Sequence, residues 1–405
     1  VSNENFMSGV SDVISNLKLK ATYGLVGNDQ IGSREDRFFY MSQIDMDGRG
    51  YVFGTDRNYS RTGIAINRYA NDLITWEIAK KTNLGIELGL FGDLTILADY
   101  FRETRENILQ TRYDIPNTMG LVTIPQANVG IAQGHGAEVE LKYQKQFRND
   151  MWLVVNGNFT YATGKYVQFE EPDYTDTPWR SYIGRKLNQP YGLIADRFFI
   201  DEEDVNNSPK QSFGPYAAGD IKYLDINGDG QINIEDQVPI GFPTVPEIIY
   251  GTGFSFGFGN VDLSCFFQGS ARSSFFIRPD LITPFINKGQ RALLQYIADD
   301  HWSETNRNLR AFWPRLSENN IQNNNQLSTH WLRDGAFLRF KTAEIGYTLP
   351  AKLTRKMNMN MFRIYASGNN LFVWSKFKMW DPEMAGNGLG YPVQRVINIG
   401  VNLTF

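Results

Sequence analysis

The segment that most clearly carries chemistry is the stretch DINGDGQINIED, which occupies positions 225–236. Oxygen-bearing side chains stand at its first, third, fifth and last positions, which is the spacing of the calcium loop of an EF-hand. A calcium ion takes about six to eight oxygen ligands, and a glycine at the sixth position, here Gly230, permits the sharp turn around it. The predicted ligands are Asp225, Asn227, Asp229, the carbonyl group of Gln231, and Asp236.

This loop departs from an EF-hand in two ways. Asp236 stands where the last ligand is usually a glutamate, and no amphipathic helical pattern flanks the loop on either side. The sequence therefore predicts an isolated structural calcium site rather than a signalling EF-hand. The alternative is an acidic turn, rich in glycine and asparagine, that matches the spacing without binding a metal.

Other residues of catalytic type do not form a recognisable constellation. His135, His301 and His330 are scattered along the chain and show no metal-ligand spacing. Asp299 and Asp300 precede His301 in ADDHW, but neighbours in sequence rarely form a working dyad. We therefore predict no catalytic residue and no enzyme activity.

Several further polar and aromatic residues fall in predicted loops. Glu170 and Glu171 in EEPDY, and the DEED run at 201–204, are interpreted as solvated loop acids. Loop tryptophans either stack on sugar rings or anchor the loops, and anchoring is the commoner role; these are Trp179, Trp302, Trp313, Trp374 and Trp380. The sequence does not identify substrate-binding residues.

Composition excludes several classes of protein. The formal net charge is −4 and no run of lysine or arginine stands out, so we expect no nucleic-acid partner. The single cysteine, Cys265, rules out an internal disulfide and alternates with apolar residues of a predicted strand. No uninterrupted apolar run reaches the about 18 residues that a transmembrane helix requires.

The elements that must position the loop at 225–236 are β-strands joined by tight turns. Apolar and polar residues alternate through most of the chain, as in the closing RVINIGVNLTF, where Ile397, Ile399 and Val401 share one side. Hairpin turns are predicted at 92–93, 148–150 and 259–260, with a modest connection at 351–361; the pattern gives about ten long strands.

Connection lengths indicate how these strands are arranged. Long polar segments separate the hairpins, at 28–74, about 110–133, 166–246, 276–335 and 377–393. Strict alternation of short and long connections is typical of an outer-membrane barrel, which has tight periplasmic turns and long extracellular loops. The predicted fold class is therefore all-β, a transmembrane antiparallel β-barrel embedded in outer-membrane lipid. The long extracellular loop at 166–246 would carry the calcium loop.

A barrel in lipid must pair its backbone internally, with apolar side chains outward and polar side chains tolerated inward. The residues predicted to face the lumen are Glu87, Glu138, Glu140, Glu344 and Arg363. An interfacial aromatic girdle is predicted at the short-turn ends, at Phe91, Tyr143, Phe147, Phe258 and Phe405.

Several segments together resemble, in order, the SusC/RagA family of TonB-dependent outer-membrane transporters typical of Bacteroidetes. They are LKLKATYGLVGN, ITWEIAKKTNLGIELGLFGDLTILADYFRETRENIL, NVGIAQGHGAEVEL, FLRFKTAEIGYTLPAKL and FRIYASGNNLFVWSKFKMWDPE. The resemblance implies a 22-stranded barrel filled by a plug domain and driven by TonB–ExbB–ExbD. It also implies a SusD-like lipoprotein lid and an oligosaccharide or peptide substrate.

With about ten strands, residues 1–405 are expected to be the C-terminal portion of such a barrel, without the plug domain and the N-terminal strands. Another polypeptide, or the rest of the same one, would then supply the missing strands, since open edges in lipid are costly. A small barrel that closes on itself is the topological alternative.

Nutrient import across the outer membrane is the leading hypothesis. A calcium-dependent surface glycan-binding or adhesin barrel without active transport is the alternative, and a small barrel enzyme is a weaker one.

Overall fold

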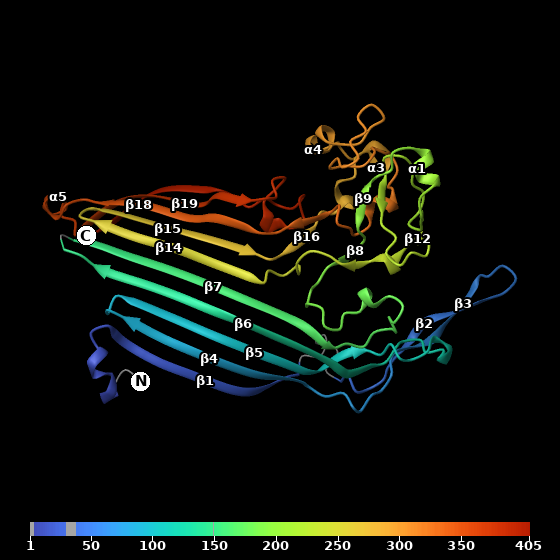
Figure 1. The fold of residues 1–405 in the computed structure, drawn as a ribbon, viewed down its shortest axis with the longest axis horizontal. Coiled ribbons are helices and arrows are strands. Elements are labelled where there is room, and N and C mark those ends of the chain that lie inside the picture. The colour runs from blue at the N-terminus through green and yellow to red at the C-terminus, as the bar shows by residue number, and fades with distance from the viewer. Residues whose placement is uncertain (1–3, 30–37, 149) are drawn as a thin grey trace.

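The computed structural model describes residues 4–29, 38–148 and 150–405. Within these ranges, no helix combines the length and the apolar character needed to cross a bilayer. The dominant element is one antiparallel sheet of ten strands (Figure 1). In spatial order its strands are β1 (Ile14–Asn28), β4 (Glu77–Leu90), β5 (Leu94–Thr111), β6 (Gln126–Gln146), β7 (Met151–Gln168), β14 (Ile248–Phe258), β15 (Val261–Ala271), β18 (Phe337–Thr348), β19 (Met361–Ser375) and β20 (Val396–Thr404).

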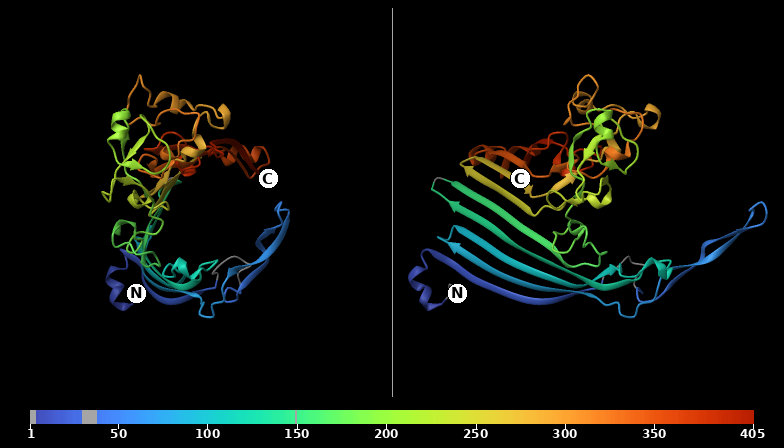
Figure 2. Two further views of the ribbon diagram at one scale, coloured as in Figure 1. Left: turned by 90° about the vertical axis from the view of Figure 1, so that its right-hand side faces the viewer. Right: turned by 45° about the vertical axis from the view of Figure 1, so that its right-hand side comes forward.

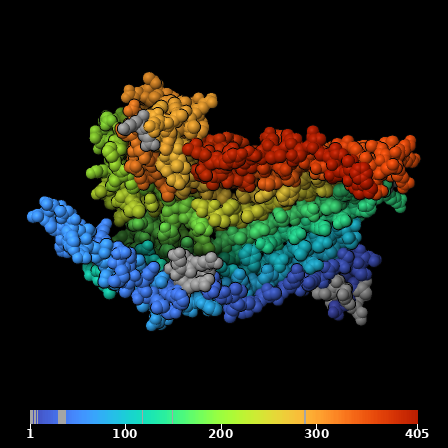
Figure 3. Space-filling view, turned by 180° about the vertical axis from the view of Figure 1, so that it is seen from behind, coloured from blue at the N-terminus to red at the C-terminus, as the bar shows by residue number. Residues whose placement is uncertain are grey.

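This sheet is curved into an open trough. Seen along the strands it has the outline of a letter C, with β1 and β20 at the two ends of the curve (Figure 2). Viewed from behind, the surface is hollowed between these two rims (Figure 3). Within the described residues β1 pairs only with β4, and β20 only with β19. The alternative of a ten-stranded barrel that closes on itself is therefore wrong.

The strand register sorts side chains onto two faces as the alternation predicts. Glu87 lies opposite Leu97, and Leu97 lies opposite Glu140, so these residues share a face. Continued across the sheet, the same register places all five charged residues predicted for the lumen on that one face, namely Glu87, Glu138, Glu140, Glu344 and Arg363. The opposite face carries the apolar rows, and Ile399 on the last strand is 81% exposed.

The outward face of β4 changes from apolar to charged residues along its length, as expected at the limit of the predicted lipid-facing band. On the outward face of β4, four apolar side chains from Leu90 to Leu84 are followed by Thr82 and Lys80. Lys80 pairs with Glu106 of β5 at 2.7 Å. Because β5, β6 and β7 are 18, 21 and 18 residues long, they continue well past the about 9–11 residues that a membrane strand needs.

The tight turns agree with the sequence prediction. At 92–93, the Asp93 N–H group donates to the Leu90 carbonyl oxygen at 3.1 Å. Gly259 adopts a positive φ of 59° in the turn between β14 and β15, a conformation that favours glycine. The short helix α5 (Ala351–Lys356) occupies the connection at 351–361. The turn predicted at 148–150 includes position 149, which lies outside the described residues.

The long connections differ from the structureless loops that the sequence suggested. The segment predicted at about 110–133 is shorter than expected, because β5 ends at Thr111 and β6 begins at Gln126, which leaves residues 112–125 as the connection. Residues 169–246 and 272–336, called here the loop body, fold together on the side of the long connections (Figure 1). The loop body contains η4 (Pro178–Arg180), β8 (Tyr191–Gly192), β9 (Ala195–Phe198), α1 (Glu202–Asn206), β10 (Lys210–Gln211), β11 (Ile221–Tyr223), β12 (Gln231–Ile232), η5 (Ile234–Asp236), β13 (Val238–Pro239), β16 (Ser274–Phe276), α2 (Pro279–Ile282), α3 (Ile286–Gly289), α4 (Gln295–Asp299), η6 (Gln322–Asn325) and β17 (Leu332–Asp334).

An apolar core holds the two segments of the loop body together. Its buried members, with Phe377 of the following connection, are Leu193, Phe198, Ile221, Tyr223, Ile232, Phe275, Ile277, Ile282, Ile297, Trp302, Ala311, Trp313 and Trp331. Buried amides join the same segments: Gln211 Nε2 donates to Asn323 Oδ1 at 2.7 Å, and Asn324 Nδ2 donates to Asp220 Oδ1 at 2.8 Å. The loop body is thus a small packed unit built from residues about a hundred positions apart.

The connection between β1 and β4 has the opposite character. It contains β2 (Gln43–Phe53) and β3 (Tyr59–Arg68), an antiparallel hairpin that projects from the long-connection end of the sheet (Figure 2). Its apolar side chains are open to solvent, with Tyr51 71% exposed and Ile64 68% exposed. We call residues 43–68 the rim hairpin. Short 3₁₀ turns complete the described elements: η1 (Asn5–Val10), η3 (Asn117–Met119) and η7 (Pro382–Met384).

Candidate functional site

The predicted calcium loop lies in the loop body, and its glycines turn as the spacing requires. Gly228 and Gly230 have positive φ values of 76° and 81°. The carboxylate of Asp225 accepts from the N–H groups of Gly228 and Gly230, at 2.7 and 2.9 Å. Asp229 Oδ1 accepts from Gln231 N at 2.7 Å. The first half of the loop is therefore wrapped around its own acidic side chains.

Asp236, at the end of the loop, is buried and binds the backbone of the loop. Its side chain is fully buried; Oδ1 accepts from Ile226 N at 2.8 Å and Oδ2 from Asn233 N at 2.8 Å. The structure thus brings Asp225, Asn227, Asp229, Gln231 and Asp236 into one closed turn. Among the described residues, no group of three or more His, Cys, Asp or Glu side chains is arranged to hold a metal. Calcium binding stays a prediction, and it requires carbonyl and amide oxygens to complete the ligand set.

The tryptophans of the loops act mainly as anchors. Trp179 Nε1 donates to the carbonyl oxygen of Glu235 at 2.8 Å, so it braces the helical turn that ends the calcium loop. Trp302 and Trp313 are buried in the core of the loop body, and Trp380 donates to Ala385 O at 2.8 Å. Trp374 differs: it lies on β19 beside the exposed Phe372, with ring centroids 6.3 Å apart.

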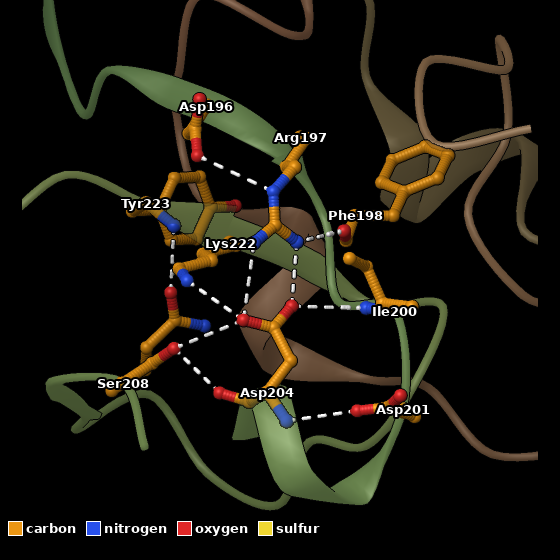
Figure 4. Close-up of polar contacts among 10 residues, drawn as sticks. Asp196, Arg197, Phe198, Ile200, Asp201, Asp204, Ser208, Lys222 and Tyr223 are labelled. Atoms are coloured by element: carbon orange, nitrogen blue, oxygen red, sulfur yellow. Dashed lines mark hydrogen bonds and ion pairs between the residues drawn. The ribbon is translucent and has the colours of Figure 1, made fainter. Parts of the chain in front are cut away.

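An ion-pair cluster around Asp204 was missed by the sequence interpretation. The Asp204 carboxylate accepts from Arg197 Nη1 at 2.5 Å and Nη2 at 3.1 Å, from Lys222 Nζ at 2.9 Å and from Ile200 N at 3.0 Å (Figure 4). Asp201 caps α1 by accepting from Asp204 N. The Arg197 guanidinium, with Lys222 behind it, holds the pKa of Asp204 well below its usual range.

Asp204 is therefore a half-buried structural hub, and interpreting the whole DEED run as solvated acids was wrong for Asp204. The same correction applies to two acids in the EEPDY motif. Glu170 pairs with Arg112 at 2.7 Å, and Glu171 accepts from Tyr182 N at 2.8 Å. Each carboxylate ties its loop to a neighbouring segment.

The histidines do not form a catalytic arrangement. His301 Nδ1 lies 2.9 Å from the Ala298 carbonyl oxygen and 3.1 Å from that of Ile297. The carboxylate of Asp300 instead accepts from the backbone N–H of Phe312 at 2.9 Å. His330 is buried with Nε2 2.9 Å from the Phe312 carbonyl oxygen, and burial lowers its pKa to about 4.

A cleft of about 500 Å³ lies where the inward face of the sheet meets the loop body. Phe101, Glu103 and Arg105 on β5 line one side of it, and Leu187 and Val245 of the loop body line another. Arg105 Nη2 lies 2.9 Å from Glu103 Oε1. An apolar floor edged by charges can hold a ligand that has both apolar and polar groups.

Glycines in the strands were the one sequence signal for this cleft. A Cβ atom at Gly136 would lie 2.4 Å from the Phe101 ring, and one at Gly164 would lie 2.8 Å from Leu187. Glycine inside a strand often marks a place where another group approaches the backbone closely. The lining residues themselves come from segments far apart in the chain, so their meeting could not be read from the sequence.

Comparison with known proteins identifies the family to which this architecture belongs. The family model described as "TonB dependent receptor-like, beta-barrel" matches residues 9–371. The chain belongs to this family. The TonB-dependent receptor-like β-barrel family explains the single curved sheet and its two contrasting faces. It comprises receptors and transporters.

Two curated relatives and one solved complex show how far the likeness extends. TonB-dependent receptor P26 of Formosa agariphila is 25% identical over 438 residues, covering 100% of this chain and 41% of the relative. TonB-dependent receptor SusC of Bacteroides thetaiotaomicron is 23% identical over 423 residues, covering 100% of this chain and 39% of SusC. The structure of the RagAB peptide transporter matches with a TM-score of 0.72 at 21% identity, over 99% of this chain and 42% of that one.

The chain thus spans about two fifths of the length of these relatives. The structural likeness shows the SusC/RagA type of barrel fold, as the sequence resemblance predicted. Family membership places the protein in the outer membrane, where the apolar face of the sheet meets lipid.

Proposed function

We propose that this protein forms part of the barrel wall and the outer mouth of a SusC-like, TonB-dependent importer of nutrient oligosaccharides or peptides. The observation that carries the proposal is the ten-stranded trough, which is apolar on one face and charged on the other. A sheet with these two faces is stable in a bilayer only if the charged face lines an aqueous interior.

The charged face supports passage of a hydrophilic cargo. Arg363 Nη2 contacts Glu344 at 2.7 Å and Asp262 at 2.5 Å, across three neighbouring strands. Lys20 and Glu87 form a second pair at 3.6 Å. Paired charges keep the wall hydrated without giving it a strong net attraction for ions of one sign.

The open edges of β1 and β20 require partners. Unpaired N–H and C=O groups in lipid each cost several kcal/mol by transfer estimates, so further strands must complete the wall. We propose that the chain supplies the C-terminal ten strands, and that the plug, the N-terminal strands and the contact with TonB–ExbB–ExbD lie in the remainder of the transporter. A SusD-like lipoprotein over the mouth is the proposed capture partner.

A pair of adjacent residues on β5 gives the test. Phe101 lines the cleft on the inward face, whereas Tyr100 points outward and is 47% exposed. Phe101→Ala should lower uptake of the growth-supporting oligosaccharide or peptide, and Tyr100→Ala should leave it unchanged at equal amounts in the outer membrane. Normal uptake in a strain from which the gene is deleted would contradict the proposal.

The alternative function is a calcium-dependent glycan-binding or adhesin barrel without active transport, which the closed loop at 225–236 also fits. The two functions separate in one experiment. A deletion strain that loses surface binding of labelled glycan but keeps its uptake would favour the adhesin. Loss of uptake that also follows from removal of TonB would favour the importer.

A further inference from the structure

A second pocket, of about 500 Å³, lies within the loop body. Three segments meet around it: β9, residues 309–312 and residues 329–333. Its charged lining residues are Asp196, Arg197, Asp300, Arg310 and Arg333. Neither the fold nor the proposed transport path accounts for the arginines here, so their partners decide what the pocket can bind.

Arg333 is a partly buried cation without an ionic partner. Its Nη1 atom donates to the carbonyl oxygens of His330 at 2.6 Å and Leu332 at 2.9 Å. No carboxylate of the described residues forms an ion pair with it, and burial lowers its pKa. A guanidinium has five N–H donors, so Nε and Nη2 remain to bind a ligand. Burying a charge without a counter-charge is costly, and a bound anion would offset that cost.

The face of Phe312 fixes the Arg333 guanidinium at the pocket wall. The Arg333 Cζ atom lies 5.8 Å from the centre of the Phe312 ring, within the range of a cation–π contact. His330, whose pKa is lowered to about 4 by burial, is uncharged at neutral pH and adds no positive charge. The positive potential at this end of the pocket therefore comes from arginine alone.

Arg310 adds a second guanidinium that has no ion pair among the described residues, and its side chain is exposed at the same pocket. Arg197 does not add to the excess, because Asp204 neutralises it. Two carboxylates also line the pocket, and the groups that they contact are not Arg333 or Arg310. Asp300 accepts from Phe312 N at 2.9 Å and Asn308 Nδ2 at 3.2 Å, and Asp196 lies 3.7 Å from Arg197.

We propose that this pocket is an oxyanion subsite, in which Arg333 and Arg310 bind a carboxylate, sulfate or phosphate group carried by a cargo molecule. The planar guanidinium fork matches the two oxygens of such a group, which a lysine would not do. The subsite would select anionic cargo before it reaches the cleft at the sheet. Its binding is independent of transport and is measured on the purified protein, so failure of the import proposal would leave it standing.

The test is isothermal titration of the detergent-solubilised protein with sodium sulfate and with sodium acetate, against sodium chloride at the same ionic strength. Saturable heat with sulfate or acetate is expected. Tighter sulfate binding would identify a sulfate or phosphate group as the natural ligand, and tighter acetate binding a carboxylate. Both outcomes support the subsite.

Two variants and a matched control assign the binding to this pocket. Arg333→Gln and Arg310→Gln should each weaken binding by about tenfold, the loss expected for one charge-assisted hydrogen bond. Arg307→Gln removes an exposed arginine that does not line the pocket and should change nothing. If Arg333→Gln does not fold, Arg310→Gln alone decides. Absence of saturable binding to both anions, or equal binding by Arg310→Gln and the unaltered protein, would overturn the proposal.

Discussion

The loop body and the rim hairpin are both connections between strands of the same sheet, yet they bury their apolar residues very differently. In the loop body Trp331 is 1% exposed and packs against Trp313, with ring centroids 5.2 Å apart. In the rim hairpin Tyr51 is 71% exposed, and among the described residues its ring has only Phe53 as an aromatic neighbour, at 5.1 Å. The loop body buries a shared apolar core, and the rim hairpin does not.

The loop body is therefore stabilised by its own packing, whereas the rim hairpin leaves apolar surface available to other molecules. An isolated two-stranded hairpin is marginally stable in water, and an exposed apolar surface is typical of an interaction site. A packed unit with buried amides and ion pairs needs no further partner to be ordered. Substitutions in the two regions should therefore have effects of different size on the local free energy of unfolding.

The largest effect is expected for Trp331→Ala. The indole is buried and its Nε1 atom donates to Asn324 O at 2.7 Å, so truncation leaves both a cavity and an unpaired carbonyl group. The loop body should lose about 3–5 kcal/mol of unfolding free energy. Hydrogen exchange of the Ile221 and Tyr223 amides in detergent measures this loss. Tyr51→Ala is the control. If it lowered the unfolding free energy of its own region as much as Trp331→Ala does, the two regions would not differ.

Calcium should stabilise the loop body and leave the rim hairpin unaffected. At a free calcium concentration about one hundred times the dissociation constant, a bound ion adds about 2.7 kcal/mol. Asp225→Asn should abolish this gain, and Glu235→Gln, in the same loop but at no ligand position, should retain it. Thermal unfolding with calcium and with a chelator measures the gain. The same melting temperature in both would mean that the loop is an acidic turn without a metal.

A smaller, pH-dependent effect is expected for Asp204→Asn. Losing the charged partner of Arg197 and Lys222 should cost the loop body about 1–3 kcal/mol at neutral pH. Because the pKa of Asp204 is lowered in the folded protein, its contribution is complete above the unfolded value of about 3.9 and fades as the pH falls below it.

Unfolding of the Asp204→Asn variant at several pH values checks both the size and the sign. The difference from the unaltered protein should be constant above about pH 5 and shrink in more acidic solution. Glu202→Gln, in the first turn of α1, is the matched control and should be neutral. A difference that grows on acidification would show that the cluster is assigned wrongly.

The smallest effect is expected for removal of the rim hairpin. Replacing residues 44–66 with a short glycine-serine linker should change the unfolding free energy of the loop body by less than about 0.5 kcal/mol. Limited proteolysis provides a second measurement, with cleavage expected in the turn at 54–58 before any cleavage in the loop body. A destabilised loop body in the shortened protein would show that the two regions support each other.

Much of the sheet could be predicted from the sequence because a period of two residues is a local signal. Each strand needs only its own alternation, and each tight turn only its own glycine or asparagine, as at 92–93 and 259–260. Register then follows, since a shift by one residue would reverse the faces and expose Glu87 or Arg363 to lipid. The calcium-loop spacing within 225–236 could be recognised for the same reason, because it also lies within one short segment.

The loop body could not be predicted, since its contacts join residues distant in sequence. Nothing near Gln211 indicates that Asn323 will meet it, and nothing near Asp204 indicates Lys222. Polar composition suggested solvated loops, but polar residues also serve as buried connectors when each finds a partner. The cleft and the oxyanion subsite arise in the same way, from segments that meet only after folding.

The hydrogen bond between Gln211 and Asn323, 112 residues apart, has a consequence for the order of assembly. The chain between them contains β14 and β15, and the pairing of these strands brings the two segments to the same end of the sheet. Closing so large a chain segment is entropically expensive, and such distant contacts slow folding. The loop body should therefore pack late, after the sheet beneath it, and the folding protein should pass through a stage with a paired sheet and an unpacked loop body.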